Sequence, residues 1–146
     1  MRPEGLLIVD PNPVYRDVLA GQLAPHCARR QVTLVAVGCA QDALAILDQQ
    51  PGYWTVVVDI QMPGLSGLAV IKAFGALASV NQVVCLSALD EKQWGPRTVR
   101  AGAVLFLSKH HRANFWCNRC SNCWRRPTAM HRLTGWRKRV MRRASG

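Results

Sequence analysis

Four short apolar runs in the first 109 residues each end at a polar residue. The runs are 6–9, 56–58, 83–86 and 104–107, and they are followed by Asp10, Asp59, Ser87 and the pair Ser108-Lys109. Runs this short and rich in Val and Ile are typical of β-strands that are buried on both faces. Together with a fifth apolar run, the pattern predicts strands at 5–10, 32–37, 55–59, 82–87 and 104–107.

The segments between these strands have the apolar spacing of amphipathic helices. Asn12 is suited to cap a first helix that begins at Pro13, since proline loses no hydrogen bond at that position. Further helices are expected at 40–49, 65–77 and 91–101, with Gly102 ending the last. The expected buried faces are Val14, Val18, Leu19 and Leu23 in the first helix and Ala43, Leu44, Ile46 and Leu47 in the second. Alternation of strand and helix with short connections predicts an α/β doubly wound parallel sheet.

The polar residues at the strand ends are expected to meet at one edge of this sheet, because ligands of open parallel sheets bind beyond the carboxyl ends of the strands. Asp10 and Asp59 would bring two carboxylates to that edge. Ser87 would add a hydroxyl and Lys109 an ammonium. The combination predicts a site for phosphoryl chemistry.

Length and composition indicate a single globular domain, since the chain has 146 residues of which 49% are hydrophobic. No apolar stretch approaches the roughly 20 residues needed to span a bilayer, and the first apolar run is too short for a signal peptide. We therefore expect a cytoplasmic protein with no membrane partner. Disulfides are then the least expected use of its cysteines, and Cys27, Cys39 and Cys85 are interpreted as small buried side chains.

Charge divides the chain near residue 110. Residues 1–109 hold nine Lys and Arg and eight Asp and Glu, whereas residues 110–146 hold ten Lys and Arg and no acid. We interpret 1–109 as the core of the domain and 127–146 as a basic, disordered tail. Nucleic-acid binding through this tail is an alternative function, because Arg and Trp136 can contact phosphates and stack on bases. A coding frame shifted after Lys109 would also give such a composition.

Residues 110–126 are interpreted as an atypical fifth helix that packs on the sheet. The apolar positions of this helix are Ala113, Trp116, Cys117, Cys120, Cys123 and Trp124, and Pro127 ends it. The three cysteines also have the spacing of zinc ligands, with His131 as a fourth, but packing is the favoured interpretation.

Several motifs carry a resemblance to a known family. The segment 59–67 (DIQMPGLSG) resembles the phosphoacceptor segment of two-component response-regulator receiver domains. The segment 7–16 is similar to that family's first strand and acidic turn, most of all in the branch with helix-turn-helix outputs. Ser87-Ala88 and the stretch from 101 to Lys109 resemble its fourth and fifth strand ends. Over residues 5–109 the resemblance implies the flavodoxin-like (βα)5 receiver fold with strand order 2-1-3-4-5.

The resemblance implies that Asp59 accepts a phosphoryl group from a histidine kinase or phosphotransfer protein. Lys109 would neutralise phosphoryl charge, while Mg²⁺ would be held by Asp10, Asp59 and the backbone carbonyl of Gln61. The protein would then be a signalling domain of a phosphorelay, with no enzymatic activity beyond transfer and loss of its own phosphoryl group.

Two further residues carry the switch that the resemblance implies. Ser87 would bond the phosphoryl group, and Phe106 would turn inward as the population shifts between two surface states. Such domains often form homodimers, which makes a second copy a candidate partner.

Two positions depart from the family's pattern. Pro11 stands where a second acid, the one that usually touches the metal, is expected, which predicts weaker Mg²⁺ binding and slower phosphorylation. It also leaves open an alternative, a phosphorylation-impaired pseudo-receiver that acts as a protein-binding module. His110 stands where the family often has proline, so the turn after Lys109 is expected to differ.

Overall fold

The computed structural model describes residues 4–50 and 52–110. The predictions made for 111–146, which are nearly all of the fifth helix, the alternative zinc ligands and the basic tail, lie outside the described residues. None of the helices in the described part combines the length and the hydrophobicity of a membrane-spanning segment.

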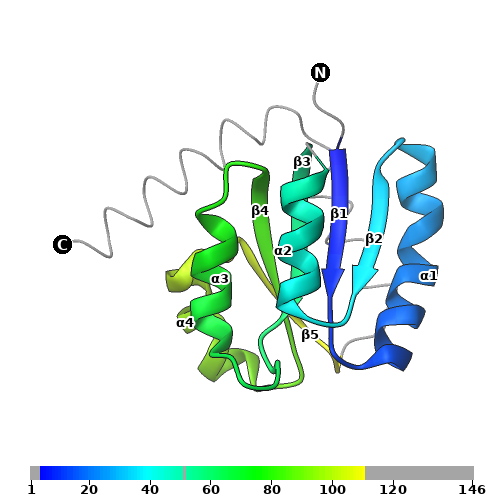
Figure 1. Ribbon diagram of the computed structural model, residues 1–146. Coiled ribbons are helices and arrows are strands. Elements are labelled where there is room, and N and C mark those ends of the chain that lie inside the picture. The colour runs from blue at the N-terminus through cyan, green and yellow to red at the C-terminus, as the bar shows by residue number, and fades with distance from the viewer. Residues whose placement is uncertain (1–3, 51, 111–146) are drawn as a thin grey trace.

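Strands and helices alternate along the described chain, as predicted (Figure 1). They are β1 (Glu4–Val9), α1 (Pro13–Arg29), β2 (Thr33–Val37), α2 (Ala40–Gln49), β3 (Tyr53–Asp59), α3 (Gly67–Gly75), β4 (Val80–Ser87), α4 (Glu91–Ala101) and β5 (Leu105–Ser108). The sheet is parallel with the order β2-β1-β3-β4-β5, which confirms the predicted fold class and strand order.

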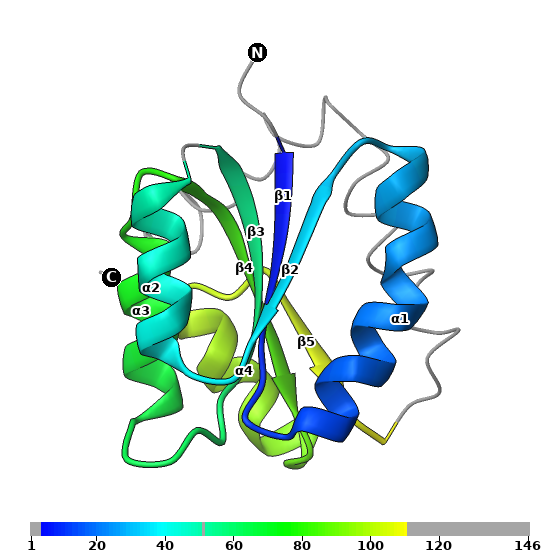
Figure 2. The same cartoon turned by 45° about the vertical axis from the view of Figure 1, so that its right-hand side comes forward.

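Helices lie on both faces of the sheet (Figure 2). On one face, α2, α3 and α4 pack against a buried cluster that includes Val56, Val58 and Phe74. On the other face, α1 contributes Leu19, Leu23 and Cys27 to a second cluster with Ile8 and Val57. Burial on both faces explains why the strands read as continuous apolar runs.

Local signals fix several helix ends. The Asn12 side chain accepts a hydrogen bond from the backbone N–H of Tyr15 (3.1 Å), which caps α1 as predicted. The Asp90 carboxylate accepts one from Lys92 N (3.2 Å) at the start of α4. Gly102 follows α4 with a φ of 120°, a conformation that favours glycine, so its predicted role is confirmed.

Some predicted buried residues are exposed. The exposed fractions are 72% for Val14, 54% for Val18 and 44% for Leu44. In α1 the residues that face the sheet recur every fourth position, from Leu19 to Cys27, and Val18 lies about 100° around the helix from this row. Periodicity located the helix and the buried positions Leu19 and Leu23, whereas Val14 and Val18 on the other side of the stripe are exposed.

Cys39 is a further correction, because it is exposed rather than buried. Its sulfur accepts a hydrogen bond from Asp42 N (3.5 Å) and so takes the place of an N-cap oxygen at the start of α2. Cys27 and Cys85 are buried, as predicted.

The register of the sheet brings the polar strand ends together. Val9 is paired with Val58, so the residues that follow in register, Asp10 and Asp59, lie side by side. On the other side of β3, Ser87 at the end of β4 is paired with Ser108, which precedes Lys109. The strands β1, β3, β4 and β5 therefore bring the candidate site residues together at their carboxyl ends.

Candidate functional site

The centre of the site is the Lys109 ammonium, which contacts two buried carboxylates. Its Nζ lies 2.6 Å from Oδ2 of Asp59 and 2.8 Å from Oδ2 of Asp10. Asp10 is completely buried, Asp59 is 3% exposed, and the Lys109 side chain is 14% exposed. Two carboxylates held this far from water need a cation, and Lys109 provides it.

Backbone N–H groups hold the second oxygen of each carboxylate. Oδ1 of Asp10 accepts a hydrogen bond from Asn12 N, and Oδ1 of Asp59 accepts one from Gln61 N, both at 2.8 Å. Each bond spans two residues, as in an Asx-turn, and so fixes the carboxylate relative to its own loop. The Oδ2 atoms are consequently both directed at Lys109.

An aromatic ring covers the ammonium from α1. Lys109 Nζ lies 4.4 Å from the centroid of the Tyr15 ring, within the range of a cation–π contact. Burial, reinforced by the negative charges of Asp10 and Asp59, raises the pKa of Tyr15 to about 12. Burial alone would lower the pKa of Lys109, but its contacts with Asp10 and Asp59 outweigh that effect and raise it. The lysine is therefore a permanent cation near neutral pH.

The predicted switch residues lie on the neighbouring strands. Ser87 is fully buried, and its Oγ accepts a hydrogen bond from Leu89 N (3.0 Å) in the loop that leads to α4. Phe106 is 5% exposed and belongs to the cluster beneath α2, α3 and α4, so its ring points into the core in this structure. Ser87 thus links the site to the start of α4.

His110 joins the two loops that flank Ser87 and Lys109. Its backbone N–H donates to Ser108 Oγ (3.2 Å), and its ring Nε2 donates to the carbonyl oxygen of Ala88 (2.8 Å). Neither bond could be made by the proline that is common at this position, because proline has no N–H and no imidazole.

The donors at the site suit a small hard cation. Oδ2 of Asp10 is buried and is paired with the Lys109 ammonium at 2.8 Å. Because both carboxylates already share one ammonium, they are close enough to share a metal ion. Among the described residues, no cluster of three or more His, Cys, Asp or Glu side chains is arranged to hold a metal ion. Mg²⁺ fits such a set, since it is commonly held by one or two carboxylates and keeps several waters.

Most of the predicted site residues are brought together. Asp10, Asp59 and Lys109 are in direct contact, and the Ser87 carbonyl accepts a hydrogen bond from Lys109 N. The structure shows the N–H of Gln61 donating to Asp59 Oδ1. Pro11 places no carboxylate after Asp10.

Sequence reasoning missed two residues of α1. Besides Tyr15, Arg16 donates from Nη1 to the backbone oxygen of Asp10 (2.8 Å) and so braces the end of β1. A signal was present, because Asn12 caps the helix and the first turn after a cap faces the end of the preceding strand. Tyr15 and Arg16 are the residues of that turn.

Comparison with known proteins identifies a family. Residues 6–118 match the response regulator receiver domain. The Fimbriae Z protein of Salmonella typhimurium is 29% identical over 117 residues, which are 78% of this chain and 53% of that protein. A protein-glutamate methylesterase/protein-glutamine glutaminase of Myxococcus xanthus is 32% identical over 112 residues, 73% of this chain and 30% of that protein.

The fold is also found among solved structures. A response regulator from Thermotoga maritima superposes with a TM-score of 0.68 at 21% identity, covering 82% of this chain and 96% of that one. The chain spans only about half the length of the Fimbriae Z protein and under a third of the methylesterase. The similarity to those two proteins therefore concerns one of their parts.

Proposed function

The chain belongs to the response regulator receiver domain family, and on this premise we propose that Asp59 is its phosphoacceptor. Receiver domains act in two-component signalling, and phosphorylation of an aspartate is general to the family. The observation that carries the proposal for this chain is the contact of one lysine with two buried carboxylates at the ends of β1 and β3.

The chemistry is a transfer between a phosphohistidine and a carboxylate. A new bond forms between an Asp59 oxygen and phosphorus while the phosphorus–nitrogen bond of the donor breaks, and its electron pair returns to the imidazole. An acyl phosphate results, which is short-lived enough to serve as a signal. Lys109, already 2.6 Å from Asp59 Oδ2, would then pair with the phosphoryl oxygens and neutralise their charge.

Mg²⁺ is proposed as the cofactor, with Asp10, Asp59 and the Gln61 carbonyl as the protein groups that hold it. When bound, the ion supplies the charge neutralisation that phosphoryl transfer requires. Asp10 Oδ2 supports this assignment, because it is a buried carboxylate oxygen that contacts the same ammonium as Asp59 Oδ2 does. Pro11 supplies no further oxygen side chain, so we propose weak binding.

Ser87 and Phe106 are proposed to pass the signal on. The Ser87 hydroxyl would exchange its bond from Leu89 N for one to the phosphoryl group and so draw the loop before α4 toward Asp59. Phe106 would turn inward with that movement, and the ring lies in the core in the state that this structure shows. The result is a shift between two populations of the α4 surface rather than a new fold.

The partners proposed for this site are a histidine kinase or phosphotransfer protein as donor and a second copy of the chain in a homodimer. We place the reaction in the cytoplasm, in agreement with the free thiols of Cys27, Cys39 and Cys85. The domain limits proposed are 1–109 for the receiver core, 110–126 for an additional helix and 127–146 for the basic tail.

Incubation with acetyl phosphate and Mg²⁺, followed by intact mass measurement, tests the proposal. We expect the mass of one phosphoryl group to be added to the native chain and none to be added to the Asp59→Asn variant. Asp42→Asn, at an exposed carboxylate of α2, is the matched control and should still be labelled. Absence of label in the native chain, with a known receiver labelled in parallel, would contradict the assignment.

Pro11 favours a second candidate, a pseudo-receiver that binds a partner without being phosphorylated. The Pro11→Asp variant separates the two candidates. An impaired receiver should be labelled faster once the acid is present, whereas a pseudo-receiver should remain unlabelled. Survival of partner binding in Asp59→Ala would also favour the pseudo-receiver.

A further inference from the structure

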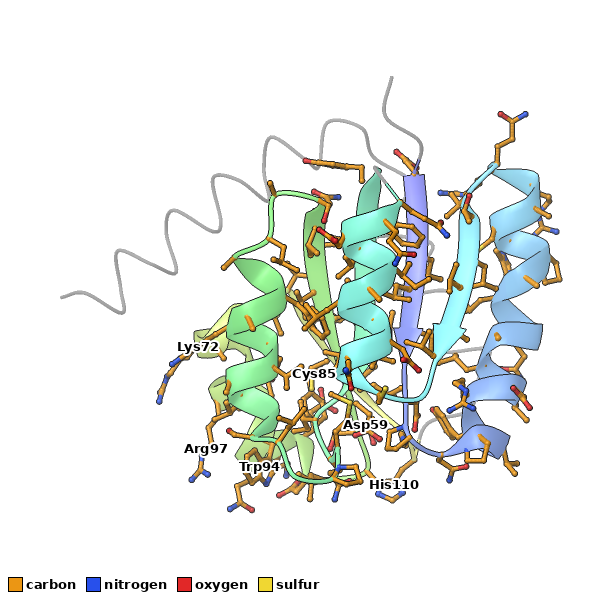
Figure 3. The ribbon with its side chains drawn as sticks, in the orientation of Figure 1. Asp59, Lys72, Cys85, Trp94, Arg97 and His110 are labelled. Carbon is orange, nitrogen blue, oxygen red and sulfur yellow. The ribbon has the colours of Figure 1, made fainter. Side chains whose placement is uncertain are left out.

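A basic groove lies between α3 and α4, which run side by side at one end of the molecule (Figure 1). The groove is an open surface cavity with a volume of about 240 Å³. Its walls are Leu68 and Lys72 from α3 and Arg97, Arg100 and Ala101 from α4. Figure 3 shows Lys72 and Arg97 extending from the two helices on the same side of the molecule, away from Asp59.

The cations of the groove are concentrated in an otherwise nearly neutral domain. Lys72, Arg97 and Arg100 are three of the nine Lys and Arg residues in 1–109, which also hold eight acids. Among the described residues, the ion pairs of the site are those of Lys109, and none of Lys72, Arg97 and Arg100 is in an ion pair of this kind. Like charges around one cavity repel one another, and an anionic occupant would relieve that repulsion.

Arg97 is held in place by its neighbour in α4. Its guanidinium lies 5.0 Å from the centroid of the Trp94 ring, which leaves its N–H groups to bind an oxyanion. Arg100 lies one helical turn further along the same face. Guanidinium groups bind carboxylates and phosphates through paired hydrogen bonds, so the groove is suited to an anion.

We propose that this groove binds an acidic segment of a partner protein, with carboxylates on the three cations and an apolar side chain between Leu68 and Ala101. A groove between two helices that is lined by both apolar and cationic side chains is suited to a peptide or helix. Nucleic acid is less suited, because it requires a wider basic surface than three cations on a nearly neutral domain. The proposal does not depend on Asp59 being phosphorylated.

Fluorescence anisotropy with the full chain tests the groove. The probe is a labelled peptide with Glu and Leu on one helical face, and its control has Gln in place of Glu. The variant Lys72→Gln/Arg97→Gln/Arg100→Gln should bind the Glu peptide about tenfold more weakly, because it removes three exposed ion pairs that are each of modest strength. All three side chains are exposed, and circular dichroism checks that the fold is kept.

A second triple variant controls for the ten cations of 110–146. Arg137→Gln/Lys138→Gln/Arg139→Gln removes the same charge from that segment and should keep the groove-dependent part of the binding. Amide shifts in NMR spectra on peptide addition should centre on Lys72 and Arg97. The proposal is overturned if the groove variant binds as the native chain does, or if the segment variant alone abolishes binding. It is also overturned if the groove variant loses affinity for duplex DNA and not for the peptide.

Discussion

The Tyr15 ring lies 4.4 Å from the Lys109 ammonium, so a residue of the first helix covers the last charged group of the site. This contact connects α1 to the end of β5 across the edge where the carboxylates lie. It also excludes water from one side of the ammonium, which strengthens the pairing of Lys109 with Asp59.

Two substitutions of Tyr15 separate the contribution of its ring to stability from the contribution of its hydroxyl. Tyr15→Leu removes the cation–π contact and should lower the free energy of unfolding by about 1–2 kcal/mol more than Tyr15→Phe, which keeps a ring. Urea unfolding of both variants measures the difference. Equal losses in the two variants would show that the ring has no special relation to Lys109.

Ionisation of Tyr15 gives a signature at high pH. The pKa of Tyr15 is raised from 10.0 to about 12 by burial and by Asp10 and Asp59, so the folded state resists its ionisation. The resulting stabilisation is fully present below pH 10 and is lost as the pH rises through about 12. In the native chain, the absorbance of tyrosinate should show one tyrosine that ionises only near pH 12, and Tyr15→Phe should lack this titration. The stability difference between native and Tyr15→Phe should narrow over the same range.

Removing the cation of the site should be costly. Lys109→Met leaves the buried carboxylates of Asp10 and Asp59 facing each other without a counter-ion, and we expect a loss of about 3 kcal/mol in urea unfolding. Adding Asp10→Asn removes one of the two charges and should restore part of the loss. If the double variant is less stable than Lys109→Met, the loss does not come from repulsion between the carboxylates.

Gly5 is a site of close packing in β1. A Cβ at this position would lie 2.4 Å from the Trp54 ring of the paired strand, so Gly5→Ala should lower stability. Overpacking of this kind costs about 1–3 kcal/mol. Gly21→Ala in α1 is the control, since its Cβ would meet nothing within 4 Å. It should raise the thermal unfolding temperature through its better helix propensity, whereas Gly5→Ala should lower it.

The strands and their polar ends could be predicted because burial on both faces leaves a strong signal in short apolar runs. The bounds of α2 and α4 agree with the predicted ranges to the residue, and Gly102 marks the end of α4. The exposed side of α1 was not predicted correctly, because an apolar stripe that includes both Val18 and Leu19 does not indicate which of them faces the sheet.

The contacts between side chains of the site were harder to predict than the identity of the residues that form it. The position of Tyr15 over Lys109 and the bond from His110 to Ala88 depend on how α1 and β5 are placed in space. Sequence spacing does not contain that information for residues as far apart as 15 and 109. The meeting of Asp10, Asp59 and Lys109 could be predicted, because the carboxyl ends of parallel strands lie at the same edge of the sheet.

The pairing of Asp10 with Lys109 unites the first and the last described strands, while Asp59 comes from the middle of the sheet. A nascent chain that has not yet added β5 has the acids but not the lysine. The site is therefore completed by the last strand to leave the ribosome among those described here. The buried pair of carboxylates thus gains its counter-ion only when the whole described sheet has been assembled.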